Sequence, residues 1–148
     1  MIEALSVKAA CNGILRNTYS TMKIYGPDTT GALDRPSFYT ELVPYLLEYQ
    51  TTNLVKQRVG FKISLMEEVT NEEFELGVLA AVRQAFGLKL PIGDRKITVS
   101  GVESEYTGQK NDVFQITVTL EWMDTIADPD DYDLIKDVTY RISVNNDN

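Results

Sequence analysis

Alternation of apolar and polar residues predicts strands most clearly in two segments of the chain. Residues 58–66 and residues 113–122 each place an apolar side chain at every second position. These positions are Val59, Phe61, Ile63 and Leu65 in the first segment, and Phe114, Ile116, Val118, Leu120 and Trp122 in the second. Because successive side chains of a strand point to opposite faces, each segment is expected to bury one face of a sheet.

Four further strands are predicted where β-branched and aromatic residues are enriched, at residues 21–25, 37–43, 96–102 and 138–144. Turn-forming or polar residues mark a loop over 26–34, a turn over 90–94, a polar stretch around 108–111 and an acidic loop over 124–137. Residues 45–49 follow Pro44, which lacks the amide donor that a central strand needs. We therefore expect an irregular or edge segment at residues 45–49.

Residues 2–18 carry apolar residues at helical spacing and are predicted to form an amphipathic helix. The apolar stripe consists of Ile2, Leu5, Ala9, Ala10, Gly13 and Ile14. Cys11, the only cysteine of the chain, falls within this helix, so no internal disulfide can form. The expected role of Cys11 is a buried small hydrophobe, because a reactive thiol needs an electropositive setting that the sequence does not indicate.

A second helix is predicted after Thr70. The sequence Thr70-Asn71-Glu72-Glu73 has the pattern of a capping box, in which Thr70 accepts from the Glu73 amide and the Glu73 carboxylate reaches back. The apolar stripe that follows is Phe74, Val78, Ala81, Val82, Ala85 and Phe86. Gly87 comes next and suits a left-handed C-terminal cap.

The order of these elements is helix, strands, helix, strands, which is typical of an α+β fold. We predict a single mixed or antiparallel β-sheet with two main helices packed on one face. The chain has 148 residues, no internal repeat and no evident linker, so residues 1–148 are expected to form one domain. Its 43% hydrophobic and 24% charged residues are the balance of a globular protein.

The overall charge restricts the possible partners. The formal net charge is −8, and phosphate binding needs clustered Lys and Arg, so specific nucleic-acid binding is not expected. No apolar run has the length of a membrane span, and the first residues lack the pattern of a signal peptide. We therefore expect a protein made and assembled in the cytoplasm, without a membrane partner.

The residues needed for most catalytic sites are missing. The chain contains no histidine, which removes the commonest general base and the commonest metal ligand. The sequence also lacks the glycine-rich phosphate-binding motifs and the nucleophile elbow. Two acidic pairs, Glu67-Glu68 and Glu72-Glu73, flank a helix start, where the helix dipole favours negative charge. We expect no enzyme activity, no cofactor and no metal.

Two groups of residues are candidates for interfaces. Asp128, Asp130, Asp131 and Asp133 form an acidic run that fails as an EF-hand, because its sixth position is Asp133 rather than glycine. The run fits a solvated surface loop, a docking surface for a basic partner or an opportunistic cation site. Tyr39, Tyr45 and Tyr49 suit either ordinary packing at a sheet edge or an oligomer interface.

The layout of the segments resembles the tail terminator family of tailed bacteriophages and phage-tail-like particles. The resemblance rests on the N-terminal helix, Ile24-Tyr25, the segment 36–40, the strand 58–65, the helix after Thr70 and the long strand 113–122. It implies a structural virion protein that forms a ring, a homo-hexamer, on the head-proximal end of the tail tube. The ring would end tail polymerisation. It would contact the tail tube protein, the neck or head-completion protein and, in contractile particles, the sheath protein.

Two other classes of protein fit the sequence. A head–tail connector or other neck protein would share the size, the acidity and the α+β layout. A small ligand-binding α+β domain would instead show a deep pocket with converging polar groups. The missing histidine and catalytic motifs count against the second alternative.

Overall fold

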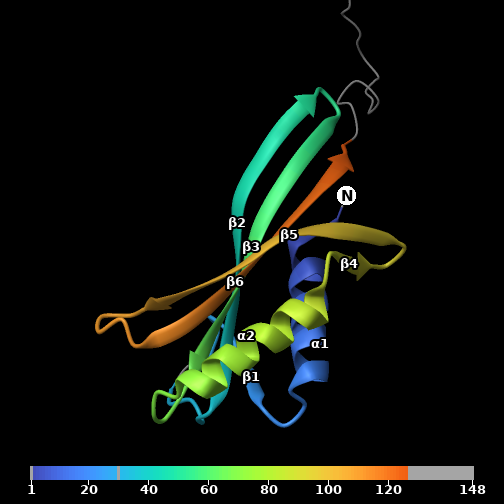
Figure 1. Ribbon diagram of the computed structural model, residues 1–148. Coiled ribbons are helices and arrows are strands. Elements are labelled where there is room, and N and C mark those ends of the chain that lie inside the picture. The colour runs from blue at the N-terminus through green and yellow to red at the C-terminus, as the bar shows by residue number, and fades with distance from the viewer. Residues whose placement is uncertain (1, 30, 127–148) are drawn as a thin grey trace, which may run out of the picture.

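The computed structural model describes residues 2–29 and 31–126. Within them, six strands form one sheet in the order β1-β2-β3-β6-β5-β4, and two helices cover one face of it (Figure 1). The strands are β1 (Lys23–Tyr25), β2 (Ser37–Thr51), β3 (Leu54–Met66), β4 (Lys89–Ile92), β5 (Arg95–Thr107) and β6 (Val113–Thr125), and the helices are α1 (Ala4–Thr18) and α2 (Glu72–Phe86). β1 runs parallel to β2 and all other neighbours are antiparallel. The predicted α+β fold with a mixed sheet is therefore confirmed.

The core lies between the helices and one face of the sheet. At its centre, Phe61 and Ile63 of β3 pair with Val118 and Ile116 of β6, and all four side chains are buried. The intervening side chains point to the opposite face, which neither described helix covers and which we call the open face. The alternation predicted for these two strands is thus the alternation between the core and the open face.

α1 packs through a different stripe from the one predicted. Its buried residues are Val7, Cys11 and Leu15, while Leu5 is 78% exposed. Val7, Cys11 and Leu15 follow one another at the helical spacing of four residues and face the sheet. Ile2, Ala10 and Ile14 of the predicted stripe are partly buried and pack at the margin of the core. Cys11 is buried as predicted, and burial raises the pKa of its thiol to about 12.

The N-terminal cap of α2 is one residue later than predicted. Asn71, not Thr70, occupies the cap, and its side-chain oxygen accepts from the Phe74 amide at 3.2 Å. Asparagine caps a helix at least as well as threonine, and this register places Glu72 and Glu73 in the first turn. Gly87 ends the helix as predicted, and its φ of 61° is one that glycine adopts readily, but its ψ of −141° differs from that of the predicted left-handed cap.

β2 is much longer than predicted. Residues 45–49 are not irregular, because β2 continues to Thr51 and pairs along its length with β3. The disturbance that Pro44 causes is confined to a β-bulge, a shift of register between Pro44 and Leu46. The expectation of an edge is confirmed within residues 2–29 and 31–126, where β1 pairs with β2 only at residues 37–39.

Two predicted loops contain strand residues. The predicted turn at residues 90–94 is β4 followed by a turn at Gly93-Asp94, and buried Leu90 pairs there with Ile97. The predicted acidic loop begins too early, because β6 continues to Thr125 and buries Asp124. The remainder of that loop and the strand predicted at 138–144 lie outside the described residues.

Candidate functional site

The outer edge of β2 is open over most of its length. Beyond the three residues paired with β1, the outer side of residues 40–51 has no partner strand among the described residues; we call this segment the β2 edge. Three of its large side chains are exposed: Tyr45 (45%), Leu47 (50%) and Tyr49 (63%). An edge strand with exposed apolar side chains offers backbone hydrogen bonds and apolar area to another chain.

A second open edge lies at the other end of the sheet. β4 pairs with β5 only at residues 95–98, so the outer side of residues 101–107 has no partner strand in the described part of the chain. We call this segment the β5 edge. It carries the exposed carboxylates of Glu103 and Glu105 together with exposed Tyr106. The two edges therefore differ in chemistry, since one is mainly apolar and the other is acidic.

The open face is polar and carries both signs of charge. Glu121 of β6 forms ion pairs with Arg58 at 3.1 Å and with Lys56 at 3.5 Å, both on β3. Burial opposes ionisation of Glu121, but the Arg58 hydrogen bond and the two positive charges hold its pKa below the usual range. A shallow cavity of about 470 Å³ lies between Tyr45 and Glu103 on this face. Its lining is open and lacks the apolar walls of a ligand pocket.

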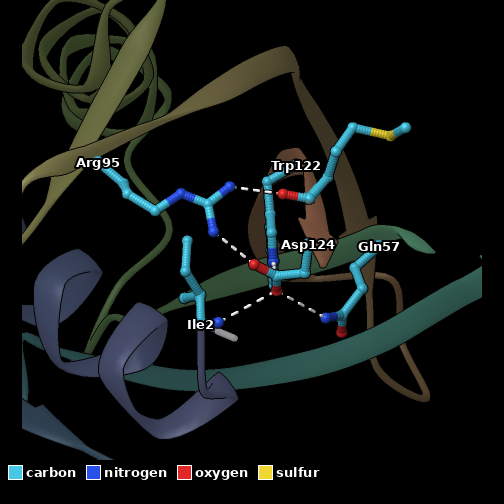
Figure 2. A network of polar contacts seen from close by, with 6 residues as sticks. Ile2, Gln57, Arg95, Trp122 and Asp124 are labelled. Carbon is cyan, nitrogen blue, oxygen red and sulfur yellow. Dashed lines mark hydrogen bonds and ion pairs between the residues drawn. The ribbon is translucent and has the colours of Figure 1, made fainter. Parts of the chain in front are cut away.

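The buried carboxylate of Asp124, near the end of β6, bonds to residues of the N-terminal segment, β3 and β5 (Figure 2). Asp124 accepts hydrogen bonds from the Ile2 amide at 3.1 Å, from Gln57 at 3.2 Å and from the Trp122 indole at 2.7 Å, and it pairs with Arg95. Burial raises the pKa of Asp124, but the bonds from Arg95, Trp122 and Ile2 outweigh that effect and hold it below the usual value. These donors leave the carboxylate little capacity for chemistry, so its role is structural.

The sequence missed this network because Asp124 follows an apolar strand and precedes an acidic run. One signal was available. The apolar positions of β6 occupy even numbers from Phe114 to Trp122, and Asp124 continues that parity toward the helix-covered face. Extending the predicted strand 113–122 by two residues would have placed Asp124 on the core side of the sheet.

The three predicted interface tyrosines all belong to β2, but they do not form one cluster. Tyr39 is half-buried between its partners Tyr25 and Ser64, in the part of β2 that β1 covers. Tyr45 and Tyr49 lie on the β2 edge. Their role as interface residues remains a prediction. The predicted residues Asp128, Asp130, Asp131 and Asp133 lie outside the described residues.

Within residues 2–29 and 31–126, no three His, Cys, Asp or Glu side chains are grouped so that they could hold a metal ion. Neither described helix is long and apolar enough to cross a membrane. The described surface presents two strand edges and the open face between them. These features suit contacts with other protein chains.

Residues 6–132 match a family described as "Phage tail terminator protein". The chain belongs to the phage tail terminator family. Membership confirms the resemblance inferred from the segment layout, and it supports a structural role in the phage tail. A search of the curated proteins gives no match.

Two solved structures are similar in fold to this terminator-family chain. One is titled "Virion of native gene transfer agent (GTA) particle", with 15% identity and a TM-score of 0.54; the match covers 80% of this chain and 94% of that one. Another solved chain has 11% identity and a TM-score of 0.52, and the match covers 87% of this chain and 99% of that one. At these identities the similarity concerns the fold alone.

Proposed function

We propose that this protein is a non-catalytic structural protein that forms a ring on the head-proximal end of the tail tube. The ring ends tube polymerisation and provides the joint to the neck or head-completion protein, and to the last sheath ring if the tail is contractile. Family membership supports the tail role. The observation that carries the ring is the pair of unlike open edges at opposite ends of one sheet.

Unlike edges favour a head-to-tail arrangement of subunits. In a two-fold dimer the same surface of each subunit meets its own copy, whereas contact between two different surfaces repeats until a ring closes or a filament grows. The β2 edge offers exposed Leu47 and Tyr49, and the β5 edge offers Tyr106 and two carboxylates. Pairing of the β2 edge with the β5 edge of the next subunit extends the sheet around the ring and covers both of these edges. A homo-hexamer is the proposed closed form.

The remaining parts of the proposal follow from the tail role. The ring is assembled in the host cytoplasm and becomes part of the virion tail or of a phage-tail-like particle. Contact with the tube and the neck requires complementary surfaces and no chemical step. DNA passes through the ring without specific binding, which suits a chain with a net charge of −8.

Electron microscopy of tubes tests this proposal directly. Tail tubes that lack the protein are collected from a producing strain without the gene and incubated with purified protein. We expect a ring-shaped density at one end of each tube, and capped tubes that no longer elongate when tube protein is added. Tubes that bind no ring and continue to grow would contradict the proposal. A ring that binds only the neck protein would indicate a head–tail connector instead.

A further inference from the structure

Glu75 is a buried carboxylate that has no positive partner in the described part of the chain. It lies in the first turn of α2, and none of its surface is exposed. One carboxylate oxygen, Oε1, accepts from the Tyr106 hydroxyl of β5 at 2.7 Å. The other oxygen, Oε2, has no hydrogen-bond partner in the described part of the chain. A buried charge left in this state is costly, so something must neutralise the site.

The surroundings exclude the usual sources of neutralisation. No ion pair to Glu75 occurs among the described residues, and no group of acids there is arranged to hold a metal ion. The titratable groups around the site are Glu67 from the loop after β3, Glu72 from α2 and Tyr106 from β5. None of these is a cation. Among the described residues, the remaining source of positive charge is a proton.

We propose that Glu67 and Glu75 share one proton, which closes a hydrogen bond between the loop after β3 and the buried face of α2. Glu67 is half-buried in the loop that precedes α2, and Glu75 lies near enough to perturb its titration. The shared proton supplies the donor that Oε2 of Glu75 lacks. Burial, and then the hydrogen bond and charge of Glu75, raise the pKa of Glu67 to about 7. Glu67 therefore loses this proton near neutral pH.

The proton links three elements. Glu67 Oε1 also accepts from the amide of Asn71 at 3.2 Å, and Asn71 is the N-cap of α2. Glu75 in turn accepts from Tyr106, which lies on the β5 edge. With the proton present, the loop, the helix start and β5 form one hydrogen-bonded chain. When the proton leaves, two adjacent carboxylates repel each other, and the half-buried Glu67 turns toward solvent and releases Asn71.

Because of this pair, the folded chain should become less stable as pH rises. This is the opposite of acid denaturation, in which stability falls as pH falls. The pKa of Glu67 is higher in the folded chain than its ordinary value of 4.5. The folded chain therefore binds more protons than the unfolded chain between about pH 4.5 and 7. Stability is greatest at the low end of this window and is lost as pH rises toward 7. For each unit by which pH rises, one extra proton bound by the folded chain increases the equilibrium constant of unfolding by up to about tenfold.

Urea unfolding of the full chain between pH 5 and 8.5 tests the proposal. The wild type should become less stable as pH rises. Glu67→Gln should remove this slope, because its amide donates to Glu75 at every pH and its carbonyl still accepts from Asn71. Glu68→Gln, a neutralisation at the adjacent exposed position, is the matched control and should keep the wild-type slope. A flat wild-type profile, a slope that persists in Glu67→Gln or a slope lost in Glu68→Gln would each overturn the proposal.

Carboxyl NMR of the folded chain provides a second readout that does not depend on unfolding. With ¹³C-labelled glutamate, one carboxyl signal should titrate with a midpoint near 7 and disappear from that range in both Glu67→Gln and Glu75→Gln. If every glutamate titrates below about pH 5.5, no shared proton exists. Both measurements use the isolated chain, so the result does not depend on ring formation.

Discussion

The ring of Tyr45 lies across Gly60 on the open face of the sheet. A Cβ added to Gly60 would lie 2.6 Å from the Cζ carbon of Tyr45, which is too close for any real Cβ contact. The β-bulge after Pro44 places Tyr45 over the neighbouring strand, and the absence of a side chain at Gly60 makes room for the ring. The bulge and the glycine thus form one local unit, similar to other aromatic side chains that cover a glycine in a sheet.

We predict that Gly60→Ala displaces Tyr45 and lowers the free energy of unfolding by about 1–2 kcal/mol, as expected for overpacking against a half-exposed ring that can move. Urea unfolding measures the loss. Gly101→Ala is the control, because a Cβ there meets nothing within 4 Å. In the double variant Gly60→Ala with Tyr45→Ala, the cost of the alanine at 60 should largely disappear. An equal cost with and without Tyr45 would show that the contact is unimportant.

Asp124→Asn should destabilise the fold. The change leaves Arg95 without its charged partner and replaces a carboxylate oxygen by an amide that cannot accept all four bonds. We expect a loss of about 2–3 kcal/mol, below the value for a fully buried pair because Arg95 is partly exposed. Asp112→Asn, an exposed change in a turn, is the control and should alter stability by less than about 0.5 kcal/mol. An equal effect of the two substitutions would contradict the structural role of Asp124.

Acid should destabilise the protein through the same carboxylate. The pKa of Asp124 is lower in the folded chain than its ordinary value of 3.8. Its contribution is therefore present above pH 3.8 and is lost as pH falls through the lower folded value. Thermal unfolding should show a steep decline in stability below about pH 4, and Asp124→Asn should reduce the steepness. Together with the Glu67–Glu75 pair, this predicts maximum stability near pH 5. A profile that declines equally in both proteins would count against the assignment.

The β2 edge should be required for assembly but not for folding. In a variant with Leu47→Lys and Tyr49→Lys, two exposed apolar side chains become charged, so an apolar contact with another chain is lost. We expect unfolding midpoints close to those of the wild type and no ring on tail tubes by electron microscopy. Leu76→Lys, on the exposed side of α2, is the matched control and should still form rings. Rings formed by the double variant would place the subunit contact elsewhere.

Sequence patterns predicted the central strands because burial and alternation coincide there, as Val59–Ile63 and Phe114–Trp122 show. The far half of β2 escaped prediction because the local signal of Pro44 opposed a strand, whereas the hairpin pairing of residues 46–51 with residues 54–58 of β3 favours one. The sequence of α1 does not show which of its faces is buried. The stripe that contains Leu5 and the stripe that contains Val7 both recur at helical spacing, and only packing against the sheet distinguishes them.

Contacts between residues distant in sequence were not predicted, although the parity of the β6 positions indicated on which face Asp124 lies. Glu75 was counted in neither acidic pair, and its burial against Tyr106 joins residues 31 positions apart. The partners of Asp124 include Ile2, at a separation of 122 residues. Tyr39, Tyr45 and Tyr49 were named together as interface candidates because tyrosine suits such surfaces. The structure exposes Tyr45 and Tyr49 and half-buries Tyr39, and the interface role of all three stays a prediction.

The measurement that tests the central claim most directly is the distribution of tail lengths, by electron microscopy, in a producing strain from which this gene has been deleted. The ring account predicts long tails of variable length without heads, and a return to uniform tails when the wild-type gene is restored. Tails of normal, uniform length in the deletion strain would contradict it, because the protein could not then be what ends tube growth.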